Sequence, residues 1–90
     1  MQLEGKIAVV TGGGRGIGRG IVDRFLDEGA SVAVVQRQAL DDALTSNAHV
    51  VHVQADLSVS SSIATAMQRA VERWGGIDIL VNNAGIMSEH

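Results

Sequence analysis

Four short apolar runs rich in β-branched residues, separated by longer stretches with helical character, constrain the fold of this chain more than any other feature. The runs are KIAVVT (6–11), SVAVVQ (31–36), VVHVQA (50–55) and IDILVNN (77–83). Continuous apolar runs of this length are typical of strands buried on both faces of a sheet. Because helical stretches join the runs, we expect parallel strands linked by right-handed crossovers.

The stretches between the runs predict three helices. The first spans 16–28 and has an apolar stripe, with Gly29 at the position of a C-terminal cap. The second, over 39–47, is short and weakly helical. The third begins at a cap on Ser58 and ends at the glycines 75–76. The residues expected to face the core are Ile17, Ile21, Val22, Phe25 and Leu26 in the first helix, and Ile63, Met67, Ala70, Val71 and Trp74 in the third.

The element order β-α-β-α-β-α-β predicts an α/β chain with a parallel sheet in the order 3-2-1-4. This order is one half of a doubly wound fold plus the first strand beyond its switch point, so the doubly wound fold is incomplete. We therefore expect residues 1–90 to be the N-terminal part of a single domain, cut after the fourth strand. That strand is apolar yet would lie at an edge, where it invites pairing with another chain.

Charge and composition argue against several classes of function. The formal net charge is −3 and the aromatic residues are one Trp and one Phe, so we expect no nucleic-acid partner. The chain has no Cys, which fits a reducing compartment. Neither a signal peptide nor an apolar run of membrane-spanning length is visible. We therefore expect a cytoplasmic location and no membrane partner.

A glycine-rich stretch, TGGGRGIG (11–18), lies between the first strand and the first helix. The start of a helix offers unpaired N–H groups and a partial positive charge, which together bind phosphate. Gly12, Gly16 and Gly18 follow the spacing G-x-x-x-G-x-G, and no Lys-Ser/Thr pair follows to make a P-loop. A flexible turn is the alternative, but the strand before and the helix after favour a dinucleotide diphosphate site.

The chain resembles the short-chain dehydrogenase/reductase family along its full length. The resemblance rests on TGGGRGIG (11–18), DL (56–57) and NNAG (82–85), in family-like order and at family-like separations. It implies a Rossmann-type fold and an oxidoreductase that transfers hydride between NAD(P)(H) and a small-molecule alcohol or carbonyl substrate. It also implies that the complete protein could form a homo-oligomer.

The same resemblance implies cofactor contacts residue by residue. The glycine loop would hold the pyrophosphate, Asp56 would bind the adenine amino group, and the segment after Asn82 would line the adenosine ribose. Asp56 could instead cap a strand end, and the asparagines could be ordinary turn residues. The predicted cofactor-binding residues are Gly12, Gly14, Arg15, Gly16, Ile17, Gly18, Gln36, Arg37, Asp56, Leu57, Asn83, Ala84 and Gly85.

The residue at the end of the second strand usually decides between NAD and NADP. A carboxylate there accepts hydrogen bonds from the ribose 2′-hydroxyl and favours NAD. By resemblance this position is Gln36, which is followed by Arg37, and Arg15 lies in the glycine loop. A guanidinium can pair with a 2′-phosphate. We therefore predict a preference for NADP(H) over NAD(H), unless both arginines simply point to solvent.

Catalytic residues are not predicted in this chain. Family members use a Ser, a Tyr and a Lys, the last two spaced as Y-x-x-x-K, whereas this chain has no Tyr and a single Lys, Lys6. The 90 residues alone are therefore expected to be inactive. A catalytically inactive dinucleotide-binding fragment and a module that assembles through its edge strand remain alternatives.

No metal site is predicted either. His49 and His52 are three residues apart in an expected strand and would face opposite sides of it. The adjacent Asp41 and Asp42 are expected to be solvated, because paired carboxylates for acid–base chemistry need facing positions.

Overall fold

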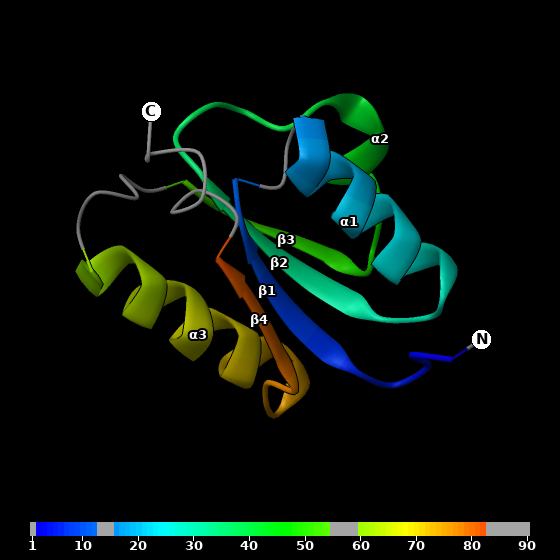
Figure 1. The fold of residues 1–90 in the computed structure, drawn as a ribbon. Helices are drawn as coiled ribbons and strands as arrows, with labels where there is room; N and C mark the ends of the chain where they lie inside the picture. The colour runs from blue at the N-terminus through cyan, green and yellow to red at the C-terminus, as the bar shows by residue number, and fades with distance from the viewer. Residues whose placement is uncertain (1, 13–15, 55–59, 83–90) are drawn as a thin grey trace.

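The computed structural model describes residues 2–12, 16–54 and 60–82, in which strands and helices alternate (Figure 1). The elements are β1 (Ile7–Thr11), α1 (Gly16–Asp27), β2 (Ser31–Gln36), α2 (Asp42–Thr45), β3 (Val50–Gln54), α3 (Ser60–Trp74) and β4 (Ile79–Asn82). All seven predicted elements are present. The largest difference is at α2, which is only four residues long because Asp41 caps its start and Ser46 closes its end on the carbonyl of Asp42.

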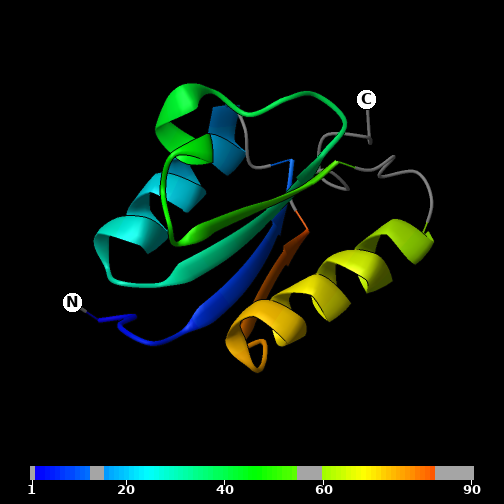
Figure 2. The ribbon, with the colours of Figure 1, turned by 180° about the vertical axis from the view of Figure 1, so that it is seen from behind.

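The four strands form one parallel sheet in the order β3-β2-β1-β4, as predicted. Val9 of β1 lies between Ala33 of β2 and Leu80 of β4. Helices α1 and α2 cover one face of the sheet and α3 covers the other, which Figures 1 and 2 show from opposite sides. The molecule therefore has three layers, with strands that all end at the same edge.

Two apolar clusters, one on each face of the sheet, make up the core. Successive residues of β1 belong to opposite clusters. Val10 packs in the cluster under α1, and Val9 packs in the cluster under α3. The buried members of the first cluster are Ala8, Val10, Val22, Val32, Val34, Leu40 and Leu44. Those of the second are Val9, Ala33, Val35, Val53, Ala66 and Ala70. Because both faces are covered, β1 and β2 are apolar almost throughout.

Three residues predicted to face the core are exposed instead. In α3, Ala66 and Ala70 are fully buried, whereas Met67 and Val71 are 37% and 47% exposed. Each residue turns a helix by about 100°, so the predicted face, which correctly included Ala70, missed Ala66 and extended too far toward Met67 and Val71. In α1, Ile17 is 69% exposed, and the buried position of that turn belongs to Gly18, one turn before Val22.

Glycines in the left-handed region end α1 and α3, as predicted. Gly29 has a φ of +94° and donates its N–H to the carbonyl of Leu26. Gly75 has a φ of +91° and donates to the carbonyl of Val71. Residues other than glycine rarely adopt this conformation, which explains why both helices stop at these positions.

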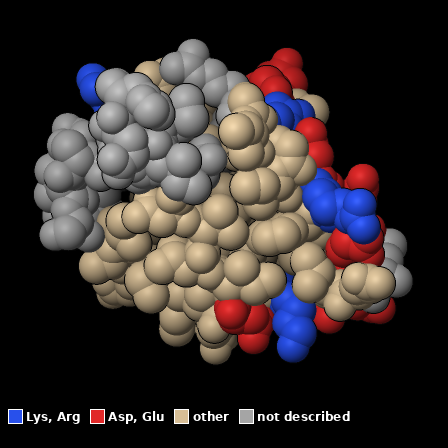
Figure 3. Space-filling model, in the orientation of Figure 1, with Lys and Arg blue, Asp and Glu red and all other residues tan. Residues whose placement is uncertain are grey.

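Strand β4 lies at an edge of the sheet and exposes apolar surface. Leu80 is 49% exposed. Charged side chains gather mainly over α1 and α2, while the middle of the face over β4 is largely uncharged (Figure 3). Within the described residues, no helix is long and apolar enough to cross a membrane.

Candidate cofactor site

Polar residues end all four strands at one edge of the sheet. They are Thr11, Gln36, Gln54 and Asn82. The register pairs Thr11 with Asn82 and Gln36 with Gln54, so these residues form a row beside the start of α1 (Figure 1). In open α/β sheets, ligands bind outside the carboxyl ends of the strands, where the strand order reverses. That point lies between β1 and β4, and this edge is the candidate site.

Thr11 joins the ends of β1 and β4 across the switch point. Its side chain is fully buried, and its Oγ1 lies 3.1 Å from Oδ1 of Asn82 and 3.4 Å from the carbonyl oxygen of Val81. The threonine hydroxyl can donate to either oxygen. The contact fixes the position of Asn82 at the end of β4.

Gly12 shapes the turn that leaves β1. Its φ is +67°, in the left-handed region, and its N–H donates to the carbonyl of Val35 at 2.7 Å. This bond extends the pairing of β1 with β2 by one residue. The amide of Gly12 is therefore engaged by the protein, and Gly12 contributes the direction of the chain rather than a donor to a phosphate.

The start of α1 presents the amides that an anion could reach. Gly16 has a φ of +61°, so helical geometry begins at Ile17. The first N–H groups of a helix have no carbonyl partner within it and carry partial positive charge. Gly18 is buried on the side facing the sheet and allows α1 to approach β1 closely. The amides of Gly16, Ile17 and Gly18 are thus the described groups best placed to bind a diphosphate.

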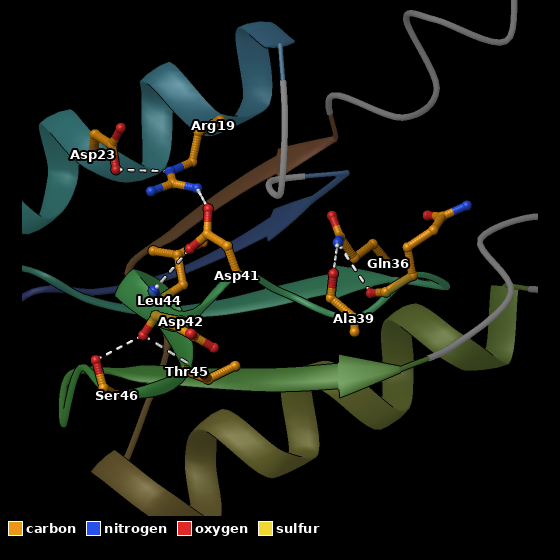
Figure 4. Close-up of polar contacts among 10 residues, drawn as sticks. Arg19, Asp23, Gln36, Ala39, Asp41, Asp42, Leu44, Thr45 and Ser46 are labelled. Atoms are coloured by element: carbon orange, nitrogen blue, oxygen red, sulfur yellow. Dashed lines mark hydrogen bonds and ion pairs between the residues drawn. The ribbon is translucent and has the colours of Figure 1, made fainter.

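The side chain of Gln36 holds the loop that follows β2. Gln36 is 8% exposed, and its Nε2 donates to the carbonyl oxygens of Gln38 at 3.0 Å and Ala39 at 3.4 Å (Figure 4). Because both protons of the side-chain amide are directed into the loop, Oε1 is the side-chain atom of Gln36 that could contact a ligand. It can only accept a hydrogen bond.

Arg37 begins this loop with an exposed side chain. Its backbone carbonyl accepts a hydrogen bond from Nε2 of Gln54 at 2.9 Å. The backbone at Arg37 is therefore anchored to β3, while its guanidinium remains accessible to a ligand.

An ionic network joins α1 to the same loop. Nε of Arg19 donates to Oδ1 of Asp23 at 3.0 Å, and its Nη1 donates to Oδ2 of Asp41 (Figure 4). The other carboxylate oxygen of Asp41 accepts the N–H of Leu44 at 3.1 Å and so caps α2. The hydrogen bond between Arg19 and Asp41 raises the pKa of Arg19 and holds the pKa of Asp41 below its ordinary value.

Asp41 is exposed, as predicted, but it also takes part in this network. The side chain of Asp41 is 53% exposed, yet it contacts both Arg19 and the start of α2. The signal in the sequence was an aspartate before a short helix, which is a favoured N-cap arrangement. Asp42, the next residue, is exposed as expected.

The remaining predicted contacts lie outside the described residues. They are Gly14, Arg15, Asp56, Leu57, Asn83, Ala84 and Gly85, together with the predicted cap at Ser58. Within the described ranges, no group of three or more His, Asp or Glu side chains could hold a metal. Nδ1 of His49 lies 3.3 Å from Oγ of Ser31, and Nε2 of His52 lies 3.3 Å from the carbonyl oxygen of Gln36.

A cavity of 380 Å³ lies at the opposite end of the sheet. It is lined by residues at the amino ends of β1, β2 and β3, which are Glu4, Gly5, Ser31, Asn47 and His49, and by the end of α1. This cavity is separated from the row of carboxyl-terminal polar residues by the length of the strands.

The sheet order and the glycine turn that enters α1 define a Rossmann-type α/β protein. A sequence model described as short chain dehydrogenase matches residues 6–90. The chain belongs to the short-chain dehydrogenase/reductase family.

Known relatives agree with this assignment. The chain is 45% identical over 89 residues to cis-1,2-dihydrobenzene-1,2-diol dehydrogenase of Pseudomonas putida, covering 96% of this chain and 32% of that protein. A short-chain dehydrogenase/reductase of Serratia marcescens superposes with a TM-score of 0.77 at 41% identity, over 92% of this chain and 37% of that one.

A further solved structure contains a bound cofactor. The 3-ketoacyl-(acyl-carrier-protein) reductase of Brucella melitensis, in complex with NADH, superposes with a TM-score of 0.74 at 36% identity, over 87% of this chain and 33% of that one. The chain spans about a third of the length of the curated relatives it matches.

Proposed function

We propose that these residues form the cofactor-binding part of an NAD(P)(H)-dependent oxidoreductase that acts on an alcohol or carbonyl substrate. The observation that supports this most strongly is that α1 begins directly after the turn that leaves β1, beside the switch point of a parallel sheet. The first N–H groups of such a helix have no carbonyl partner within it. When bound, the nicotinamide cofactor supplies the hydride chemistry, and the protein binds and orients it.

The roles that we propose for the individual residues come from the family resemblance. The amides of Gly16–Gly18 bind the diphosphate, and Gly12 sets the turn that brings them there. Asp56 and Leu57 contact the adenine, and Asn83–Gly85, with Ala84 at their centre, line the adenosine ribose. Thr11 and Asn82 hold the floor of the crevice at the ends of β1 and β4.

The proposed cofactor preference is for NADP(H). No carboxylate stands at the end of β2, and the exposed Arg37 follows directly. Because the amide protons of Gln36 are directed into the loop, Arg37 and Arg15 would have to provide the donors for a 2′-phosphate. The predicted donors are therefore guanidinium groups, which suit a phosphate better than a neutral amide does.

The activity belongs to a chain that also carries the catalytic Tyr and Lys of the family. With no Tyr and only Lys6, the 90 residues alone would bind cofactor without transferring hydride. We also place the protein in the cytoplasm, which the absence of Cys supports.

A second candidate function is assembly through β4. The exposed Leu80 at the edge of the sheet, with Met67 and Val71 exposed on α3, favours contact with another chain or with a second copy. A protein that self-associates but binds no dinucleotide would support this candidate over the first.

Titration of the intact protein with NADPH and with NADH, followed by nicotinamide fluorescence, tests the proposal. We expect both to bind, with NADPH about tenfold tighter, the size of one added charge-assisted hydrogen bond. Binding of neither dinucleotide would contradict the proposed function. Tighter binding of NADH would contradict the proposed preference alone.

A further inference from the structure

The contacts of Arg19 connect two segments that border the proposed cofactor site. Arg19 follows Gly18 in the first turn of α1, where the diphosphate is proposed to bind. Its partner Asp41 ends the loop that begins at Arg37, directly after Gln36 (Figure 4). Gln36 is the residue proposed to border the adenosine ribose. In the proposed binding mode, the network therefore joins the segment at the diphosphate to the segment at the 2′ position.

The charges in this network do not cancel. Arg19 carries one positive charge, while Asp23 and Asp41 each carry one negative charge, so the group has a net charge of minus one. Both carboxylates hold the guanidinium through hydrogen bonds. Among the described residues, the cation in the first turn of α1 is thus more than neutralised, which disfavours an added phosphate dianion nearby.

We propose that Asp41 is a specificity-determining residue that limits the preference for a 2′-phosphorylated dinucleotide by neutralising Arg19. The proposal rests on the proposed function and extends it to residues outside the glycine loop and the end of β2. It assigns Arg19 a favourable contribution to 2′-phosphate binding, and Asp41 an opposing one. NAD(H), which carries the diphosphate but lacks the 2′-phosphate, is expected to respond less than NADP(H) to both.

Asp41→Asn separates the charge of Asp41 from its structural role. Asparagine caps a helix as well as aspartate does, so the hydrogen bond from Leu44 is retained while the negative charge is lost. Asp42→Asn is the matched control. Asp42 is exposed and follows Asp41 directly, so this variant removes an equal charge at the neighbouring position. Arg19→Gln removes the positive charge of the network, so it changes the net charge in the opposite direction to Asp41→Asn.

The quantity to measure is the ratio of the NADH to the NADPH dissociation constant for the intact protein and its variants. We expect Asp41→Asn to raise this ratio about threefold and Arg19→Gln to lower it by about the same factor, as one unit charge near a phosphate implies in partly solvated surroundings. The NADH dissociation constant should stay within about twofold, and the effect of Asp41→Asn should shrink at high ionic strength.

An unchanged ratio in Asp41→Asn, or the same change in Asp42→Asn, would overturn the proposal. So would an equal loss of affinity for both cofactors, which is the signature of a purely structural role. If Asp41→Asn does not fold, Asp41→Ser, which also caps a helix without charge, decides the matter. Failure of the wild-type protein to bind either dinucleotide would instead contradict the proposed function itself.

Discussion

Replacement of Gly29 with alanine is expected to lower the free energy of unfolding by about 3 kcal/mol, combining left-handed backbone strain with a steric clash. The φ of Gly29 is +94°, and an added Cβ would lie 2.9 Å from Cα and 3.2 Å from N of Glu4. That backbone cannot yield easily, because Leu3 donates to the carbonyl of Glu28 at 2.8 Å. Urea denaturation of the intact protein measures the loss.

Two other glycines separate the strain from the clash. Gly75 has a φ of +91° with nothing within 4 Å of an added Cβ, so Gly75→Ala should cost only about 1 kcal/mol of strain. Gly20 lies inside α1, also with open space around it, and Gly20→Ala should stabilise the protein by up to about 1 kcal/mol. Equal losses in Gly29→Ala and Gly75→Ala would show that the contact with Glu4 is unimportant.

Replacement of Gly16 with valine is expected to weaken dinucleotide binding by roughly 30- to 100-fold, the loss of about one hydrogen bond to a charged group. Gly16 has a φ of +61°, which a β-branched residue adopts poorly, and nothing lies within 4 Å of an added Cβ. The protein should therefore fold with a modest loss of stability, while the altered backbone no longer presents its amides to the diphosphate. Fluorescence titration with NADPH measures the change.

Gly20→Val is the matched control for this experiment. It adds the same side chain one turn further along α1, at an exposed position with a helical φ and open space around it. We expect the affinity of Gly20→Val to stay within about twofold of wild type. A folded Gly16→Val protein with unchanged affinity would show that the diphosphate does not bind at this turn.

The sheet could be predicted from sequence because its central strands, β1 and β2, are buried on both faces. Residues such as Val9 and Val10 are both fully buried, although they point to opposite sides, so β1 is apolar without a break. Helical connections between such strands allow few sheet topologies, and the strand order 3-2-1-4 is the one expected among them. The glycines that end α1 and α3 were predictable for a similar reason, since their conformation excludes most other residues.

The face of α3 that packs on the sheet was predicted less accurately than the sheet itself. The sequence predicts a buried face that contains Met67, Ala70 and Val71, whereas the fully buried positions are Ala66 and Ala70. Hydrophobicity favours the larger side chains, but the helix packs on the sheet through the alanines, which are fully buried. Close packing between a helix and a sheet depends on shape as much as on hydrophobicity.

Within the candidate site, sequence identified the glycine turn but not the contacts around it. The inward orientation of the Gln36 amide depends on the carbonyls of Gln38 and Ala39, which no residue pattern specifies. The link between Arg19 and Asp41 spans 22 positions of sequence and depends on where α2 begins. The sequence predicts a helix from 39, whereas α2 begins at Asp42, so neither the cap at Asp41 nor the ionic network is apparent from the sequence.

The central claim is that amides at the start of α1 bind the dinucleotide diphosphate, and an amide nitrogen–proton NMR titration of the intact protein tests it most directly. On addition of NADPH, the account predicts large shifts for Gly16, Ile17 and Gly18. Gly5, Ser31 and His49, which line the cavity at the amino end of the sheet, should shift little. Unshifted amides at Gly16–Gly18, or shifts confined to that cavity, would contradict the account.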